Sequence, residues 1–341
     1  MSKQTILVTG GTGFIGSHTV VELINQGYDV HIIDNLSNSR QHIVDDIEQI
    51  TGTKPSFTKL DLCNAEECNS FFSQHTNIKS VIHFAALKAV GESVEQPLLY
   101  YNNNLSGLIN ILNNAQQGNI ENFVFSSSCS VYGEPDSLPI SESAPLKEAE
   151  SPYANTKRIS EDILRDFCKV SELKTIALRY FNPIGAHSSA LIGEYPLNAP
   201  TNLMPVITQT AIGIREKLLV NGTDYNTPDG SCIRDYIHVV DLAKAHLVAL
   251  ERLIDKRVKS NYEIFNLGTG KGTSVLEMIH TFEEVTGVKL NYHLQGRRAG
   301  DVVQVFADTK YANDELGWKS NLDIKEMISS AWKWEQALAK K

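Results

Sequence analysis

The 341-residue sequence predicts an α/β fold in which helices cover both faces of a parallel sheet. Through the first half of the chain, short apolar runs alternate with amphipathic stretches, and this rhythm is typical of right-handed βαβ units. The runs are apolar throughout rather than at every second position, which indicates strands buried on both faces. A glycine-rich turn after the first run lets the chain pass tightly from a strand into a helix.

The expected strands are separated by helix-like segments such as Ser17–Gln26 and Leu105–Gln117. In chain order these strands are Ile6–Thr9, Val30–Asp34, Phe57–Leu60, Val81–Phe84, Phe123–Ser126 and Thr175–Tyr180. Because each strand is followed by a helix before the next strand begins, we expect a doubly wound parallel sheet of the Rossmann type.

The glycine-rich turn between the first strand and the first helix predicts a cofactor. Its glycines at Gly10, Gly13 and Gly16 permit a close approach of backbone to a pyrophosphate at the helix N-terminus. Asp34 ends the second strand, where a carboxylate binds the adenosine ribose and repels a 2′-phosphate. The pattern favours NAD over NADP, although such glycines also occur in ordinary turns. Asp61, which follows the third strand, is either a neighbour of the adenine or a solvated acid.

A second lobe is expected after Asn182, where proline, glycine and asparagine punctuate residues 183–236. The α/β pattern then resumes with a helix-like stretch at Val239–Leu253 and a strand-like Tyr262–Leu267. We therefore expect an NAD-binding domain at 1–182, to which 237–267 returns, and a smaller substrate-binding α/β lobe at 183–236 and 268–341.

The composition restricts the partners of the protein. A net charge of −9 argues against nucleic acid or an anionic membrane surface. The five cysteines include no C-x-x-C pair, which indicates reduced thiols. The histidines do not show the spacing that is typical of a metal site. The N-terminus passes directly into the first strand, and no apolar run reaches membrane-spanning length. We expect a soluble cytoplasmic protein without a metal.

Tyr153 and Lys157 are the most informative pair of residues in the chain. A spacing of four places both side chains on one face of a helix. An ammonium beside a phenol favours the phenolate, so we expect the pKa of Tyr153 to be lowered and the tyrosine to act as a general base. Ser128 follows a strand at the edge of the sheet where ligands bind. Taken alone, this tyrosine–lysine spacing also arises by chance, and a serine-rich strand end is often a solvated turn.

Together, Ser128, Tyr153 and Lys157 resemble the catalytic set of the short-chain dehydrogenases/reductases, in the extended branch that modifies nucleotide sugars. Further motifs, spread over essentially the whole chain, are similar to the UDP-glucose 4-epimerase family within that branch. They are His83-Phe-Ala-Ala-Leu-Lys-Ala-Val-Gly-Glu-Ser93, Arg179-Tyr-Phe-Asn-Pro183, Asn202-Leu-Met-Pro205, Ile233-Arg-Asp-Tyr-Ile-His238, Asn266-Leu-Gly268 and Arg297-Arg-Ala-Gly-Asp301. The resemblance implies inversion at C4 of a UDP-hexose through a transient 4-keto sugar, with NAD bound throughout.

Three other classes stay open at this point: a 4,6-dehydratase, a UDP-uronate 4-epimerase and a non-catalytic NAD-sensing module. Related 4,6-dehydratases place an Asp-Glu pair after the catalytic serine or threonine, whereas Cys129 and Ser130 stand there in this chain. A glucuronate decarboxylase would also need an acid at Ser130. A UDP-uronate 4-epimerase shares the catalytic set but needs a further cation for its carboxylate. A non-catalytic NAD-sensing module would keep the glycine turn without the tyrosine–lysine pair.

The resemblance also implies roles for individual residues. Those near the cofactor are Gly10, Gly13, Phe14, Ile15, Gly16, Asp34, Asn35, Asp61, Leu62, Phe84, Ala85, Lys88, Asn103, Ser126, Tyr153, Lys157 and Tyr180. Those facing the UDP-sugar are Lys88, Ser128, Tyr153, Asn182, Asn202, Leu203, Arg234, Arg298, Asp301 and Val305.

Among these residues, the arginines would bind the diphosphate and Asp301 the uridine ribose, although each arginine also fits a plain surface charge. Asn221 departs from the family pattern, which usually carries an aromatic residue beside the nucleotide. His83 and His238 have apolar neighbours in the sequence and are expected to be core histidines.

Val305 bears on the choice of hexose. In the family, a tyrosine at this position restricts the enzyme to glucose and galactose, and the smaller valine implies activity on UDP-GlcNAc and UDP-GalNAc as well. The family also pairs helices that correspond to residues 100–117 and 153–170 in an intersubunit four-helix bundle. The resemblance therefore implies a homodimer, with packing inside one subunit as the alternative.

Overall fold

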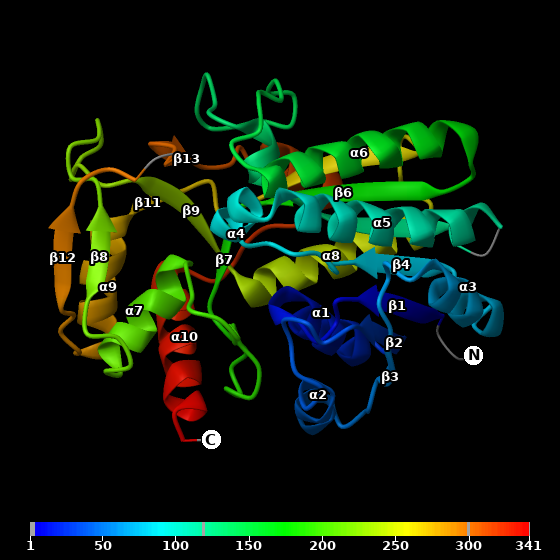
Figure 1. Cartoon of the computed structure of the whole chain (residues 1–341), viewed down its shortest axis with the longest axis horizontal. Coiled ribbons are helices and arrows are strands. Elements are labelled where there is room, and N and C mark those ends of the chain that lie inside the picture. The colour runs from blue at the N-terminus through cyan, green and yellow to red at the C-terminus, as the bar shows by residue number, and fades with distance from the viewer. Residues whose placement is uncertain (1–3, 118–119, 299–300, 341) are drawn as a thin grey trace.

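The computed structural model describes residues 4–117, 120–298 and 301–340. The chain forms two lobes that lie side by side, and the larger one contains most of the N-terminal half (Figure 1). A seven-stranded sheet organises the larger lobe, and smaller sheets organise the other. The α/β fold class expected from the sequence is confirmed. Within the described residues, no helix is long and apolar enough to cross a membrane.

The seven strands of the large sheet are all parallel and lie in the order β10-β6-β5-β4-β1-β2-β3. Their bounds are β1 Thr5–Thr9, β2 Asp29–Asp34, β3 Ser56–Lys59, β4 Ser80–His83, β5 Asn122–Ser128, β6 Lys174–Tyr180 and β10 Tyr262–Leu267. The order reverses at β1, as in doubly wound sheets, so the strand ends beside β1 and β4 form the crevice where ligands bind.

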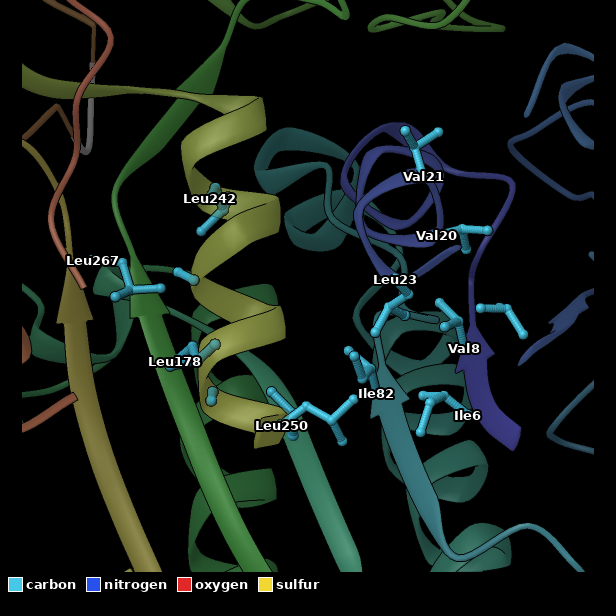
Figure 2. Close-up of a cluster of buried hydrophobic side chains, with 14 of the residues drawn as sticks. Ile6, Val8, Val20, Val21, Leu23, Ile82, Leu178, Leu242, Leu250 and Leu267 are labelled. Atoms are coloured by element: carbon cyan, nitrogen blue, oxygen red, sulfur yellow. The ribbon is translucent and has the colours of Figure 1, made fainter. Parts of the chain in front are cut away.

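Alternate residues of each strand face opposite layers of helices. Ile6 and Val8 of β1 face one hydrophobic cluster, while Leu7 between them faces another. Figure 2 shows the first cluster, in which Leu242 and Leu250 lie beside strand residues. Helices α1 (Phe14–Asn25), α2 (Ile43–Thr51) and α8 (Val239–Ile254) cover this face, and α3 (Ala65–Gln74), α5 (Pro97–Gln116) and α6 (Pro152–Val170) cover the other.

Two helices begin earlier than their apolar patterns indicate. Helix α1 begins at Phe14 rather than Ser17, and α5 begins at Pro97 rather than Leu105. Proline is well placed at the first helical position, but the asparagines that follow it hide the helical pattern. One of them, Asn104, is buried and uses its side chain to bond Leu87 and Thr156 instead of packing as an apolar residue would.

The smaller lobe packs three helices against short strands around its own core. Strand β9 (Ile233–His238) pairs with β7 (Asn182–Ile184), β11 (Gly272–Ser274) and β13 (Gln304–Val305). Strands β8 (Leu218–Asn221) and β12 (Tyr292–Gln295) form a second, parallel pair. The helices are α7 (Leu203–Ala211), α9 (Val275–Thr286) and α10 (Ile324–Leu338). A π-helical turn at Ala312–Leu316 belongs instead to the larger lobe, because Ala312 and Leu316 are buried in the same cluster as α8. Short helices at Val90–Glu95 (α4) and Cys129–Tyr132 lie at the strand-end edge of the large sheet.

Candidate active site

The glycine-rich turn brings backbone close to backbone at the start of α1. Gly10 has a φ of +70°, in the left-handed region that favours glycine. A Cβ at Gly10 would lie 2.7 Å from the backbone nitrogen of Ala85, so a larger residue would separate this turn from the loop after β4. Gly13 caps α1 without any side-chain acceptor for the first-turn N–H groups. This geometry suits an anion at the helix N-terminus.

Asp34 lies buried at the end of β2, next to that turn. Its carboxylate accepts hydrogen bonds from the backbone nitrogen of Leu36 at 2.9 Å and from the hydroxyl of Ser39 at 3.0 Å. The backbone nitrogen of Thr12 donates to its other oxygen at 3.3 Å. Nearby, Asp61 accepts from the backbone nitrogen of Cys63 at 2.9 Å. Both predicted acids are therefore held in fixed orientations along the groove.

The predicted catalytic residues meet where β5 and α6 approach each other. Ser128 is the last residue of β5, and Tyr153 lies in the first turn of α6. The start of α6 is fixed by Ser151, whose hydroxyl accepts a hydrogen bond from the backbone nitrogen of Ala154 at 3.2 Å. Lys157 follows one turn later and is 5% exposed, with its ammonium donating to the carbonyl of Ser126 at 2.7 Å.

The electrostatics of the pair differ from the sequence-based expectation of a lowered tyrosine pKa. Burial raises the pKa of Tyr153 to about 12, and a hydrogen bond with Ser128 only partly opposes this. Burial also lowers the pKa of Lys157 to about 8. Because the Lys157 ammonium is directed to a backbone carbonyl, the loss of water around the phenol dominates.

A buried ion pair supports Lys157 from the next turn of α6, and sequence reasoning missed it. Glu161 receives two hydrogen bonds from Arg179, at 2.9 and 2.5 Å, and one from the hydroxyl of Ser127 at 2.5 Å. Its charge favours the protonated form of Lys157 and so opposes the effect of burial on the lysine pKa. The signal was present in the sequence, because Glu161 follows Lys157 by four residues and therefore shares its helix face.

Glu194 is a second residue that sequence reasoning missed. Its carboxylate accepts hydrogen bonds from Lys88 at 3.0 Å and from Asn202 at 2.8 Å. Glu194 thereby contacts two predicted binding residues, Lys88 of the larger lobe and Asn202 of the smaller lobe. No periodicity marks Glu194, which lies in an irregular segment, so only the folded chain reveals this contact.

The remaining substrate-side residues lie on the smaller lobe. Arg298 forms an ion pair with Asp301 at 2.6 Å. Arg234 is on β9, and Val305 on the adjacent β13 is 9% exposed. The buried carboxylate of Asp235 accepts from the backbone nitrogen of Ala307 at 3.1 Å, which holds the chain two residues after Val305. Asp235 is the third residue missed, although it lies inside one of the motifs.

All of the predicted site residues line one continuous groove between the two lobes, with a volume of about 1500 Å³. Asn221 lines it as well. The two histidines expected in the core have structural partners: His83 bonds the hydroxyl of Thr9 at 2.7 Å, and His238 accepts from the backbone nitrogen of Val240 at 3.1 Å. Among the residues that the structure describes, no group of three or more His, Cys, Asp or Glu residues could hold a metal ion.

Comparison with known proteins identifies relatives that act on nucleotide sugars. Residues 7–331 match the family model described as GDP-mannose 4,6 dehydratase. The chain is 50% identical over 331 residues to a UDP-glucose 4-epimerase of Dictyostelium discoideum, with 97% of this chain and 95% of that protein covered.

Two solved structures are informative about ligands. A UDP-glucose 4-epimerase of Stenotrophomonas maltophila, crystallised with NAD and formylated UDP-arabinopyranose, is 46% identical with a TM-score of 0.95, and 99% of each chain is covered. The UDP-Glc/GlcNAc 4-epimerase of Campylobacter jejuni is 35% identical with a TM-score of 0.84, covering 98% of this chain and 99% of that one.

Proposed function

This chain belongs to the UDP-glucose 4-epimerase family, and on that premise we propose that it interconverts UDP-glucose and UDP-galactose with NAD as its bound cofactor. The observation that carries the proposal is the convergence of Ser128, Tyr153 and Lys157 on the same groove as the glycine-rich turn. A 4,6-dehydratase is disfavoured because Cys129 and Ser130 supply no acid–base pair for the elimination of water. The burial of Cys129 raises the pKa of its thiol to about 12, which makes it a poor base.

The cofactor side of the groove fits a dinucleotide. The first turn of α1 presents its N–H groups without a side-chain cap, and Gly10 leaves room where a side chain would meet the loop after β4. We assign the pyrophosphate to this turn and the adenosine ribose to Asp34. We propose that residues 1–182 with 237–267 form the NAD-binding domain, and that 183–236 with 268–341 bind the UDP-sugar.

Tyr153 is the proposed acid–base residue. NAD bound in the groove would supply a hydride acceptor and donor for C4, together with a positive charge on the nicotinamide. The raised pKa of Tyr153, about 12, means that the phenolate needs such a positive charge nearby. As phenolate, Tyr153 takes the proton from the 4′-hydroxyl. As phenol, it returns the proton to the 4-keto sugar after the sugar has rotated in the groove.

Ser128 and Lys157 support that proton transfer. The hydrogen bond of Ser128 with Tyr153 lowers the pKa of the phenol, and its hydroxyl is placed to polarise the same sugar oxygen. The pKa of Lys157, about 8, leaves its ammonium mostly protonated near neutral pH, where it binds the ribose of the nicotinamide half. Glu161 and Arg179 hold this part of α6 against β5 and β6.

The smaller lobe binds the nucleotide in this proposal. Arg234 and Arg298 bind the diphosphate by charge-assisted hydrogen bonds, and Asp301 accepts from the uridine ribose. The sugar is held less firmly than the nucleotide, so it turns about the diphosphate link and presents its opposite face. Asn182, Asn202 and Leu203 line this part of the groove.

We also propose activity on UDP-GlcNAc and UDP-GalNAc. Val305 packs in a small cluster with Tyr132, Ile140 and Phe181, and its short side chain leaves volume that a tyrosine would fill. Exclusion of an acetamido group needs filled volume, so valine admits the larger sugars. Support comes from the C. jejuni relative, which is described as acting on both glucose and N-acetylglucosamine nucleotides.

A homodimer is the proposed assembly. Helix α5 exposes Leu98, Leu99 and Ile109, which are 80%, 43% and 42% exposed, beside α6 on the outside of the larger lobe. Apolar side chains exposed along one helix fit a helix from a second subunit. We place the protein in the cytoplasm, which agrees with the five free cysteines.

The decisive experiment incubates the purified protein with UDP-galactose or UDP-GalNAc without added NAD and separates the products by chromatography. We expect both C4 epimers of each pair, formed without net consumption of a nucleotide cofactor. Absence of UDP-glucose from the first reaction, even after addition of NAD, would overturn the assignment. Absence of UDP-GlcNAc from the second would remove only the N-acetyl activity.

A further inference from the structure

A dipeptide of the smaller lobe, Glu194–Tyr195, reaches across the groove to the larger lobe. It is anchored on α10, where the indole nitrogen of Trp334 donates to the carbonyl of Glu194 at 2.9 Å. The ring of Tyr195 lies edge-on to Trp334, with 6.0 Å between the ring centroids. A Cβ at Gly193 would lie 2.5 Å from the indole, so only glycine lets the backbone approach this closely. The dipeptide is therefore fixed to its own lobe.

The first contact across the groove joins Glu194 to Lys88, which follows β4. The carboxylate and the ammonium are 3.0 Å apart, and the Glu194 side chain is only 13% exposed. The Lys88 ammonium also lies 6.0 Å from the ring centroid of Phe14, the first residue of α1. Glu194 thus reaches the loop beside the helix N-terminus to which the pyrophosphate is assigned.

The second contact joins Tyr195 to Arg40, in the loop after β2. The guanidinium lies 4.1 Å from the centroid of the tyrosine ring, a close cation–π stack. Arg40 directly follows Ser39, whose hydroxyl donates to Asp34 and bonds Thr12 at 2.7 Å. Tyr195 is thereby connected to the part of the groove assigned to the adenosine ribose. All four contacting residues line the groove itself.

We infer that Glu194 and Tyr195 form a clasp that retains the cofactor, an inference that rests on the proposed NAD-dependent function. One dipeptide contacts the loop after β4 and the loop after β2, which flank the glycine-rich turn on its two sides. A dinucleotide lying along that turn passes between the loops, so its departure requires the clasp to open. The two contacts involve none of the three proposed catalytic residues. Their loss should therefore change the rate of cofactor exchange and not the rate of proton transfer.

The chain contains a matched stack for comparison. Arg297 lies 4.3 Å from the ring centroid of Tyr225, nearly the geometry of Arg40 on Tyr195. Both members of this second pair belong to the smaller lobe, and neither lines the groove. Removal of Arg297 therefore reproduces the loss of an arginine–tyrosine stack without opening the proposed clasp.

The test measures how fast bound NAD exchanges with isotopically labelled NAD in solution, read by mass spectrometry of the nucleotide released on denaturation. The variants are Tyr195→Ala, Arg40→Ala and the double variant Glu194→Gln/Tyr195→Ala, and the controls are Tyr195→Phe and Arg297→Ala. An exposed cation–π or ion-pair contact is worth about threefold in rate, so we expect about threefold faster exchange in each single variant and about tenfold in the double variant. Both controls should exchange at the wild-type rate.

The outcomes separate the clasp from the function on which it rests. If the wild-type protein neither carries NAD nor acquires it, the proposed function fails. If the wild-type protein holds NAD and Arg40→Ala exchanges at the same rate, the clasp is wrong. It is also wrong if Arg297→Ala accelerates exchange as much as Arg40→Ala does. Arg40 is exposed, so its variant decides the matter even where Tyr195→Ala fails to fold.

Discussion

The two sides of the groove are built in different ways. On the cofactor side, the key groups are backbone turns and short, buried side chains at strand ends, such as Asp34 at 6% and Ser128 at 9% exposure. On the substrate side, Arg298 extends from a loop with its side chain 61% exposed, and Arg234 extends from the short strand β9. The large sheet fixes the first side through hydrogen-bonded strands, whereas on the second side a single ion pair with Asp301 holds Arg298 on irregular backbone.

This difference matches the two proposed ligands. A cofactor that is regenerated in each turnover needs a rigid, preformed site, because exchange brings no benefit. A substrate that enters and leaves needs contacts that form and break, and the exposed Arg298 on its loop provides one. Changes on the cofactor side should therefore affect chemistry or retention, while changes on the substrate side should affect affinity and choice of sugar.

The largest effect is expected from Tyr153→Phe, which removes the proposed acid–base group from the cofactor side. General acid–base catalysis contributes about a hundredfold to ten-thousandfold, so kcat should fall by that range. The ring keeps its packing, and NAD should remain bound at the wild-type ratio. Kinetics with UDP-galactose and the nucleotide content of the purified variant check both points. A near-normal kcat would show that another group moves the proton.

A smaller effect is expected from Arg298→Ala on the substrate side. A charge-assisted hydrogen bond is worth about 1.5–3 kcal/mol, so KM for the UDP-sugar should rise about tenfold to a hundredfold with kcat little changed. Arg297→Ala is the matched control, because the neighbouring arginine pairs with Asp224 at 2.8 Å and does not line the groove. An equal effect in both variants would indicate a general charge effect instead of a specific contact.

The sequence predicted the rigid side well for a physical reason. Strands buried on both faces leave continuous apolar runs, and a close backbone approach demands glycine. Both features can therefore be detected in a short stretch of the sequence. The order of the strands places Gly10, Asp34 and Ser128 at one edge once the runs are known. Local patterns therefore predicted the fold class and residues that line one groove in the folded chain.

What the sequence could not predict depends on contacts between distant segments. Glu194 meets Lys88 from 106 residues away, and no local pattern indicates which of the acids does so. The pKa of Tyr153 was misjudged because helix spacing shows that Lys157 shares its face, but not that the ammonium bonds the carbonyl of Ser126. Direction of a side chain and depth of burial are properties of the folded chain.

The choice of sugar offers a prediction that separates the two sides further. Val305→Tyr should lower kcat/KM for UDP-GalNAc by about tenfold or more and leave UDP-galactose within about twofold, because the added ring would fill volume only where we propose that the 2′ substituent lies. Val305→Ala should keep both activities. Competition assays with the two substrates measure the ratio. Parallel loss of both activities in Val305→Tyr would show that the ring disturbs the groove as a whole.

The smallest expected effect concerns stability in acid, and it arises in the larger lobe. Burial lowers the pKa of His18 and His83 to about 3 and that of His246 to about 4, from an ordinary 6.5. The folded protein therefore binds fewer protons than the unfolded chain below about pH 6.5, so stability falls as the pH decreases through that window. Each such histidine should cost about 1.4 kcal/mol near pH 5.5.

A variant tests this at one position. His246 lies between the rings of Phe84 and Tyr180, at 4.6 and 5.9 Å between centroids. His246→Phe keeps a ring there and removes the titrating group. Urea unfolding measures the free energy of unfolding near pH 7.5 and near pH 5.5. Its decrease from the higher to the lower pH should be about 1.4 kcal/mol smaller in the variant than in the wild type. An equal loss in both proteins would mean that the acid sensitivity lies elsewhere. As a control, His293→Phe at an exposed position of the smaller lobe should lose as much stability as the wild type.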